Sequence, residues 1–189
     1  MKPGILNELW AERLKKGSVT KFKVASGSMK PLINIGDRVA VKKVDNLGRV
    51  RLGDIVLFST TGNYVVHRII GKSHQRGELF FRQKGDASLQ SGIVSGREIR
   101  GKIIAIEKSH GLIRLDTRAD KVASFLLGVC FVLSDGAYRA LKKIKTTFFT
   151  KHSDLDTRLF KVIKIMLGKT PEFFVNIFLR SKRNKIDPG

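Results

Sequence analysis

The sequence predicts a mainly β domain, with a short helix before it and an α-helical extension after it. Between residues 19 and 108, short apolar segments alternate with polar residues, and glycine-containing turns separate these segments. After residue 108 the apolar residues recur at every third and fourth position instead. We therefore expect an N-terminal helix in residues 1–18, a compact antiparallel β domain in 19–108 and a basic helical extension in 109–189.

The first expected element is a helix over Asn7–Lys16. Its apolar residues share one face, and Gly17 suits the C-terminal cap; the face comprises Leu6, Leu9, Trp10 and Leu14.

Six strand-like segments follow, each short and rich in branched or aromatic residues. They are Val19–Ala25, Arg38–Val44, Asp54–Phe58, Tyr64–Ile70, Leu79–Gln83 and Gly101–Glu107.

The extension then carries helical patterns over Lys121–Lys145, Thr157–Leu167 and Pro171–Arg180. The basic amphipathic segment Thr157–Leu167 is typical of a helix that packs its apolar face on the β domain and exposes its lysines to water. Adsorption to an anionic lipid surface is the alternative.

The net charge of +21 would draw this chain to polyanions or to an anionic membrane surface.

No secretory signal peptide is recognisable. The longest apolar run, Val122–Leu133, is a dozen residues, whereas a membrane-spanning helix needs about 20. We therefore expect no transmembrane helix and a location in the cytoplasm or peripheral to the membrane. The single cysteine, Cys130, permits no intrachain disulfide, and we expect no metal site and no cofactor.

Ser28 and His67 are the candidate catalytic residues. Ser28 follows a strand-like segment between Gly27 and Met29, and His67 lies inside a second such segment. A serine hydroxyl needs a base to become a nucleophile, and a neutral imidazole can take its proton at physiological pH. Ser26 could offer a hydroxyl to the oxyanion beside the Ser28 backbone N–H. A structural histidine is the alternative role for His67.

Five short blocks surround these residues, and their order and gaps are informative. They are Ser26-Gly27-Ser28-Met29-Lys30-Pro31, Gly36-Asp37-Arg38-Val39, Gly53-Asp54-Ile55-Val56-Leu57-Phe58, His67-Arg68-Ile69-Ile70 and Lys84-Gly85-Asp86-Ala87. Over residues 22–107 this series resembles the type I signal peptidase family and its relatives, the LexA-type self-cleaving repressors. With His67 where a lysine base would fall, the chain is similar to the archaeal and endoplasmic-reticulum subtype.

The resemblance implies a β fold and a serine endopeptidase that cleaves a signal or leader peptide after small residues. By that similarity Ser28 is the nucleophile, His67 the general base and Ser26 an oxyanion donor, while Met29 and Pro31 lie at the substrate groove. An aspartate that this subtype carries after Lys-Gly-Asp is missing here. Asp86 is then either the acid that orients His67 or a structural turn residue.

Two alternatives remain at this stage. A catalytically silent module could keep the groove and capture extended peptides. A LexA-type DNA-binding regulator is disfavoured, because about twenty residues before the motif are too few for a helix-turn-helix domain. We therefore do not expect nucleic acid as a partner, and the expected partners are an extended peptide and an anionic membrane surface.

Overall fold

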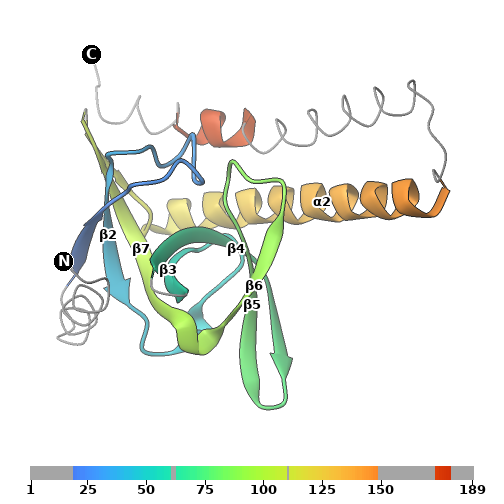
Figure 1. Cartoon of the computed structure of the whole chain (residues 1–189). Helices are drawn as coiled ribbons and strands as arrows, with labels where there is room; N and C mark the ends of the chain where they lie inside the picture. The colour runs from blue at the N-terminus through green and yellow to red at the C-terminus, as the bar shows by residue number, and fades with distance from the viewer. Residues whose placement is uncertain (1–18, 61–62, 110, 149–172, 180–189) are drawn as a thin grey trace.

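The computed structural model describes residues 19–60, 63–109, 111–148 and 173–179. It confirms a mainly β fold, in which one curled antiparallel sheet is crossed by a long helix, α2 (Figure 1). The expected helices over Asn7–Lys16 and Thr157–Leu167 lie outside the described residues. The division into three segments stays a prediction.

Eight strands form the sheet, in the order β1-β2-β7-β3-β4-β5-β6, with β8 paired to β7. They are β1 (Thr20–Lys23), β2 (Arg38–Lys43), β3 (Ile55–Thr60), β4 (Asn63–Gln75), β5 (Glu78–Lys84), β6 (Ser91–Ser95), β7 (Ile99–Lys108) and β8 (Gly111–Arg114). Two single turns of 3-10 helix, η1 (Leu47–Arg49) and η2 (Gly96–Glu98), lie in the connections. Six strands match the expected segments, whereas β6 and β8 were not expected.

Register shifts curl the sheet. The β2–β7 pairing slips between Ala40 and Val41, and the β4–β5 pairing slips between Ile69 and Gly71. Such bulges increase the local twist and bend the bulged strand. As a result the edge strand β1 approaches β4, where the rings of Phe22 and Tyr64 lie 6.0 Å apart.

Both faces of the sheet are buried, each by a separate apolar cluster. In β3, Ile55 and Leu57 belong to one cluster while Val56 and Phe58 belong to the other, as the two-residue period of a strand requires. The first cluster also holds Leu127 of α2. The helix therefore completes the core on one face of the sheet.

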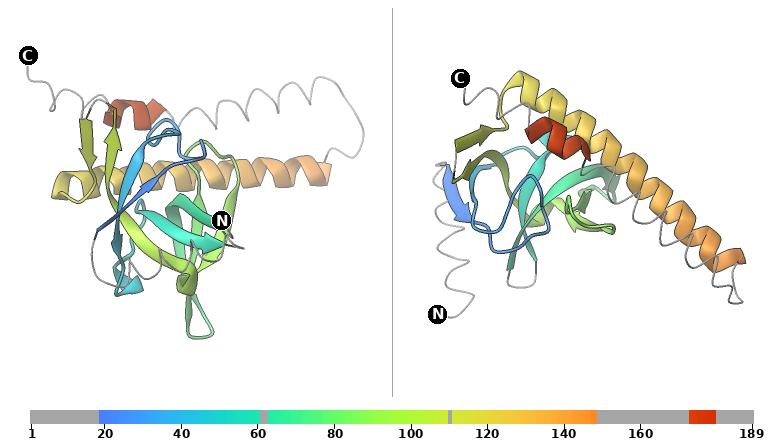
Figure 2. Two further views of the ribbon diagram at one scale, coloured as in Figure 1. Left: turned by 60° about the vertical axis from the view of Figure 1, so that its left-hand side comes forward. Right: turned by 90° about the horizontal axis from the view of Figure 1, so that it is seen from above.

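α2 (Arg118–Phe148) runs across that face and extends well past the sheet (Figure 2). A short helix over residues 173–179 lies beside α2 and buries Val175 in the same cluster. By length and composition alone, the stretch Arg118–Lys143 is apolar enough to cross a membrane. The expectation that the chain has no transmembrane helix is therefore not confirmed.

Candidate active site

Ser28 and His67 converge on one point, the position of Gly85. A Cβ atom placed on Gly85 would lie 3.2 Å from Ser28 Cβ and 3.1 Å from His67 Nε2. Ser28 and His67 are therefore neighbours, although 39 positions separate their numbers in the chain. Only a glycine fits between them, because any side chain would also press on the Ser28 carbonyl oxygen, 2.6 Å away.

Three elements bring these residues together. Ser28 lies in the loop between β1 and β2, His67 in the first half of β4, and Gly85 directly after β5. The backbone N–H of Ala87 donates to the Ser28 carbonyl oxygen at 2.9 Å. This bond ties the loop that carries Ser28 to the turn that follows β5.

Gln83, not Asp86, is the partner of the His67 ring. Gln83 Oε1 accepts a hydrogen bond from His67 Nδ1. The proton then resides on Nδ1, and the lone pair of Nε2 is directed toward the Ser28 side. Gln83 was not among the expected site residues.

The surroundings of His67 favour the neutral imidazole. Burial lowers the pKa of His67 below its usual value, while the hydrogen bond to Gln83 and the charge of Asp86 act in the opposite direction. The Phe58 ring meets the imidazole edge to face, with centroids 5.9 Å apart. A base that is neutral near pH 7 is ready to accept a proton.

Asp86 has a structural partner. Its two oxygens accept from Arg68 Nε at 2.8 Å and from Arg68 Nη2 at 2.6 Å, and both side chains are buried. The geometry does not support Asp86 as the acid that orients His67, because the fork of Arg68 takes both oxygens. Arg68 also donates to the Gly53 carbonyl oxygen at 3.0 Å.

Ser26 lies close to Ser28, as expected, with their hydroxyl oxygens 3.4 Å apart. Among the described residues the Ser28 backbone N–H donates to no other group, and no hydrogen bond joins Ser28 to His67. Catalytic hydrogen bonds are often long in an unliganded site and tighten when substrate binds.

Met29 does not lie at an open groove. Its side chain is only 2% exposed and packs in the core, because the turn after Ser28 directs Met29, Leu32 and Ile33 inward. Pro31 follows a cis peptide bond and is half-buried. Within the described residues, no group of three His, Cys, Asp or Glu side chains could hold a metal ion.

Comparison with known proteins connects this site to a family. Residues 14–77 match the family described as signal peptidase, peptidase S26. Signal peptidase I W of Bacillus subtilis (strain 168) is 35% identical over 82 residues, which cover 42% of this chain and 43% of that protein. The chain thus spans less than half the length of this relative. No solved structure matches the chain.

Proposed function

Because residues 14–77 belong to the signal peptidase family, peptidase S26, we propose that this chain is a serine endopeptidase that cleaves signal or leader peptides. The observation that carries the proposal is the convergence of Ser28 and His67 on Gly85. A silent peptide-binding module would not need a free imidazole nitrogen beside a serine.

In the proposed mechanism, the Ser28 hydroxyl attacks the carbonyl carbon of the scissile bond. His67 Nε2 takes the serine proton and later gives it to the leaving amine, while Gln83 holds Nδ1. The Ser28 N–H and the Ser26 hydroxyl donate to the oxyanion. Water then hydrolyses the acyl-enzyme with His67 again as the base. The arrangement is a dyad with an amide as its orienting group.

The substrate would lie as an extended strand between β1 and β4. β1 is an edge strand that leads toward Ser26 and Ser28. In β4, residues 63–67 pair with β3 on one side, whereas pairing with β5 begins only at Arg68. A peptide that adds as a strand beside these segments would gain affinity from main-chain hydrogen bonds. By family similarity, the residue before the cut is small.

The test is cleavage of a peptide with small residues flanking one bond. Ser28→Ala and His67→Ala should abolish cleavage, and Ser26→Ala should slow it about 100-fold through loss of one oxyanion donor. Ser73→Ala and His74→Ala are matched controls, because these residues lie in the exposed far half of β4. Cleavage by Ser28→Ala at the wild-type rate, or peptide binding without cleavage by the wild type, contradicts the proposal.

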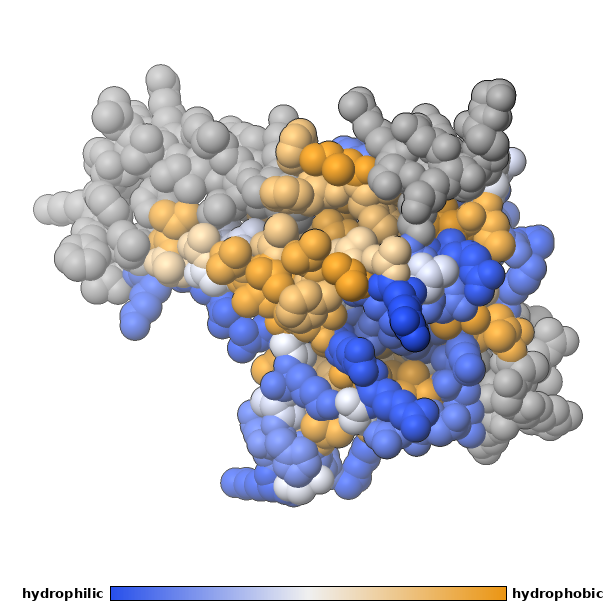
Figure 3. Space-filling model, turned by 180° about the vertical axis from the view of Figure 1, so that it is seen from behind, coloured by the Kyte–Doolittle hydropathy of each residue, from blue (hydrophilic) through white to orange (hydrophobic). Residues whose placement is uncertain are grey.

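We also propose that the chain attaches peripherally to an anionic membrane through the outer face of α2. Val122, Phe125, Leu126 and Leu133 are exposed there, and an apolar patch lies on this side of the molecule above a hydrophilic region (Figure 3). The opposite face of α2 is occupied by the sheet and buries Phe131 and Asp135. A helix fixed in this way would lie on a bilayer rather than cross it.

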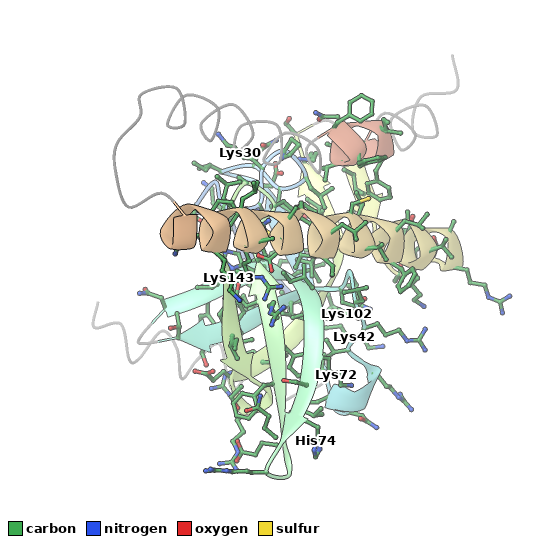
Figure 4. All side chains as sticks on the ribbon, turned by 90° about the vertical axis from the view of Figure 1, so that its right-hand side faces the viewer. Lys30, Lys42, Lys72, His74, Lys102 and Lys143 are labelled. Carbon is green, nitrogen blue, oxygen red and sulfur yellow. The ribbon has the colours of Figure 1, made fainter. Side chains whose placement is uncertain are left out.

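A basic pocket adjoins the apolar face of α2. Its volume is about 700 Å³, and Val122 and Phe125 form part of its lining. Six basic side chains line it, Lys42, Lys43, Arg49, Arg51, Lys102 and Lys121, together with three acidic ones, Asp45, Asp54 and Asp116, so the lining carries a net positive charge. Lys102 pairs with Asp54 at 2.6 Å. Lys42 and Lys102 lie side by side below α2 (Figure 4). Basic side chains beside an apolar face suit the phosphates of an anionic bilayer.

Sedimentation with vesicles tests this attachment. Binding should be strong to phosphatidylcholine vesicles containing phosphatidylglycerol, weak to phosphatidylcholine alone, and reduced by Leu126→Gln. Ile93→Gln is the matched control, because Ile93 is equally apolar and exposed but belongs to β6. Equal sedimentation of Leu126→Gln and Ile93→Gln contradicts the role of α2.

A further inference from the structure

Four ionisable side chains are buried where α2 crosses β4 and β5, directly behind the candidate site. They are Arg68, Lys84, Asp86 and Asp135. Burying charge is costly unless each charge is compensated, so this cluster has to be held by specific contacts. The dyad mechanism uses none of these side chains directly.

Phe131 of α2 contacts both cations of the cluster. Its ring, 1% exposed, lies 5.4 Å from Arg68 Cζ and 5.6 Å from Lys84 Nζ. Cations at this distance from a ring are attracted to its face, more strongly where water is excluded. One side chain of the helix thus contacts the strand of His67 and the strand of Gln83.

Two buried carboxylates offset part of the effect that burial has on the pKa of Lys84. Burial lowers the pKa of Lys84, but the charges of Asp135 and Asp86 raise it. Asp135 itself is buried, and its Oδ2 has no hydrogen-bond partner among the described residues although Arg139 Nε lies 3.1 Å away. Because Arg139 is exposed, this ion pair compensates the buried charge of Asp135 only weakly.

A short series of contacts joins Phe131 to the nucleophile. The ring lies over Arg68, and Arg68 holds both oxygens of Asp86. Asp86 lies in the turn between Gly85, which abuts His67 Nε2, and Ala87, which donates to the Ser28 carbonyl oxygen. Phe131, Arg68, Asp86 and Gly85 in this series are buried, whereas Ala87 is exposed.

We propose that Phe131 is a positioning residue for the Ser28–His67 pair, acting through Arg68 and Asp86. The inference rests on the proposed peptidase function. It assigns a role to α2, which lies beyond the segment that matches the signal peptidase family. The Phe131 ring holds the Arg68 guanidinium in place, and Arg68 in turn holds the turn that contains Asp86. The position of this turn sets the distance between the Ser28 hydroxyl and the His67 imidazole.

The first test compares substitutions on one helix in the full-length chain. Phe131→Leu removes the ring and keeps an apolar side chain; kcat should fall about tenfold with KM unchanged. Phe131→Tyr keeps the ring and should stay within about threefold of the wild type. Leu127→Ala is the matched control, because Leu127 is a buried α2 residue one turn earlier that belongs to the apolar core. It should lose stability but retain kcat.

The second test does not depend on activity. Phe131→Leu loosens Arg68 and leaves the charge of Asp86 less compensated, so the pKa of His67 should rise in an NMR titration of the imidazole. Leu127→Ala should leave it unchanged. Should Phe131→Leu not fold, Phe131→Met supplies a flexible side chain that fills the same space.

Two results overturn the inference. One is a kcat for Phe131→Leu equal to that of Leu127→Ala after correction for the folded fraction. The other is a His67 pKa that does not respond to Phe131→Leu. Absence of peptidase activity in the wild type would instead refute the proposed function, and the titration would still decide whether α2 is coupled to His67.

Discussion

An amide rather than a carboxylate faces Nδ1 of His67, and this sets the charge balance of the site. A carboxylate would stabilise the imidazolium and raise its pKa, whereas the neutral Gln83 does so only through its hydrogen bond. The buried carboxylate nearby, Asp86, is already committed to Arg68. His67 therefore remains a weak, neutral base of the kind that works at moderate pH.

The pH dependence of cleavage should reflect this balance. His67 must be neutral to take the serine proton, so activity rises as pH rises through its pKa. Because burial lowers that pKa, the midpoint of the acidic limb should lie below about 6.5. Gln83→Glu should move the limb to higher pH, since a carboxylate stabilises the imidazolium. The measurement is kcat/KM from about pH 4.5 to 8.

Gln75→Glu is the control for this charge change, because Gln75 is exposed at the far end of β4. An acidic limb centred above the usual histidine value in the wild type would show that burial does not govern His67.

Gly85 is the second residue on which the site depends. A methyl group on Gly85 would meet the Ser28 carbonyl oxygen at 2.6 Å, and neither this oxygen nor the imidazole can move without changing the distance between nucleophile and base. We expect Gly85→Ala to lower kcat/KM about 100-fold while the chain still folds. Peptide cleavage and circular dichroism measure the two effects.

Gly71→Ala is the matched control, because a Cβ on Gly71 would meet only Arg82 Cβ, at 3.4 Å. If Gly85→Ala cleaves the peptide as fast as Gly71→Ala, the tight contact around Gly85 does not affect catalysis.

Sequence patterns identified part of this site. Ser28, His67 and Ser26 lie close together, as the family resemblance implied. Gln83 could not be found in this way. Its approach to His67 follows from the β4–β5 register, in which Gln83 lies opposite Ile69, and local sequence does not encode a register.

At the scale of elements, α2 and the loop before β3 are joined by two glycines. A Cβ on Gly128 would lie 2.7 Å from the backbone nitrogen of Gly53. Conversely, a Cβ on Gly53 would lie 1.9 Å from the backbone oxygen of Ser124, and Gly53 also has a φ of +88°. The helix and the sheet therefore approach backbone to backbone, and side chains would force them apart.

This contact gives a stability prediction. Gly128→Ala should destabilise the fold by about 1–3 kcal/mol, because the added methyl group overpacks a contact between two backbones. Gly136→Ala, on the same helix, should stabilise it by up to about 1 kcal/mol, because no atom lies within 4 Å and alanine favours the helix. Denaturant unfolding measures both. A Gly128→Ala variant as stable as Gly136→Ala would show that the helix does not touch the sheet at Gly53.

The strands that patterns missed have a common cause. β6 is a short edge strand whose sequence, Ser-Gly-Ile-Val-Ser, offers only two apolar residues, and it is defined by its pairing with β5. β8 likewise exists through pairing with β7, beyond the expected end of the β domain at residue 108. β4 and β5 run past their apolar parts into a polar hairpin. Pairing with a neighbour, rather than local propensity, extends such strands.

At the scale of the whole molecule, the net charge of +21 should influence how substrate arrives. A field of one sign attracts an acidic peptide from a distance, and salt screens it within about 10 Å at 0.1 M. For a peptide with several acidic residues outside the cleavage site, kcat/KM should fall about tenfold between low and high salt. The same peptide with amides in place of carboxylates should change little. If kcat/KM for the two peptides depends equally on salt, the net charge of the protein does not steer the substrate.

The hydrogen bond from Ala87 to the Ser28 carbonyl has a consequence for modularity. The segment by which the chain is recognised, residues 14–77, ends before Ala87, and also before Gln83 and Phe131. Transplanting that segment into another scaffold would carry Ser28 and His67, the proposed nucleophile and base, but not the contacts from Ala87 and Gln83 that hold the two residues in place. A transferable form of the site would therefore have to be longer than residues 14–77, and it would have to include the part of α2 that carries Phe131.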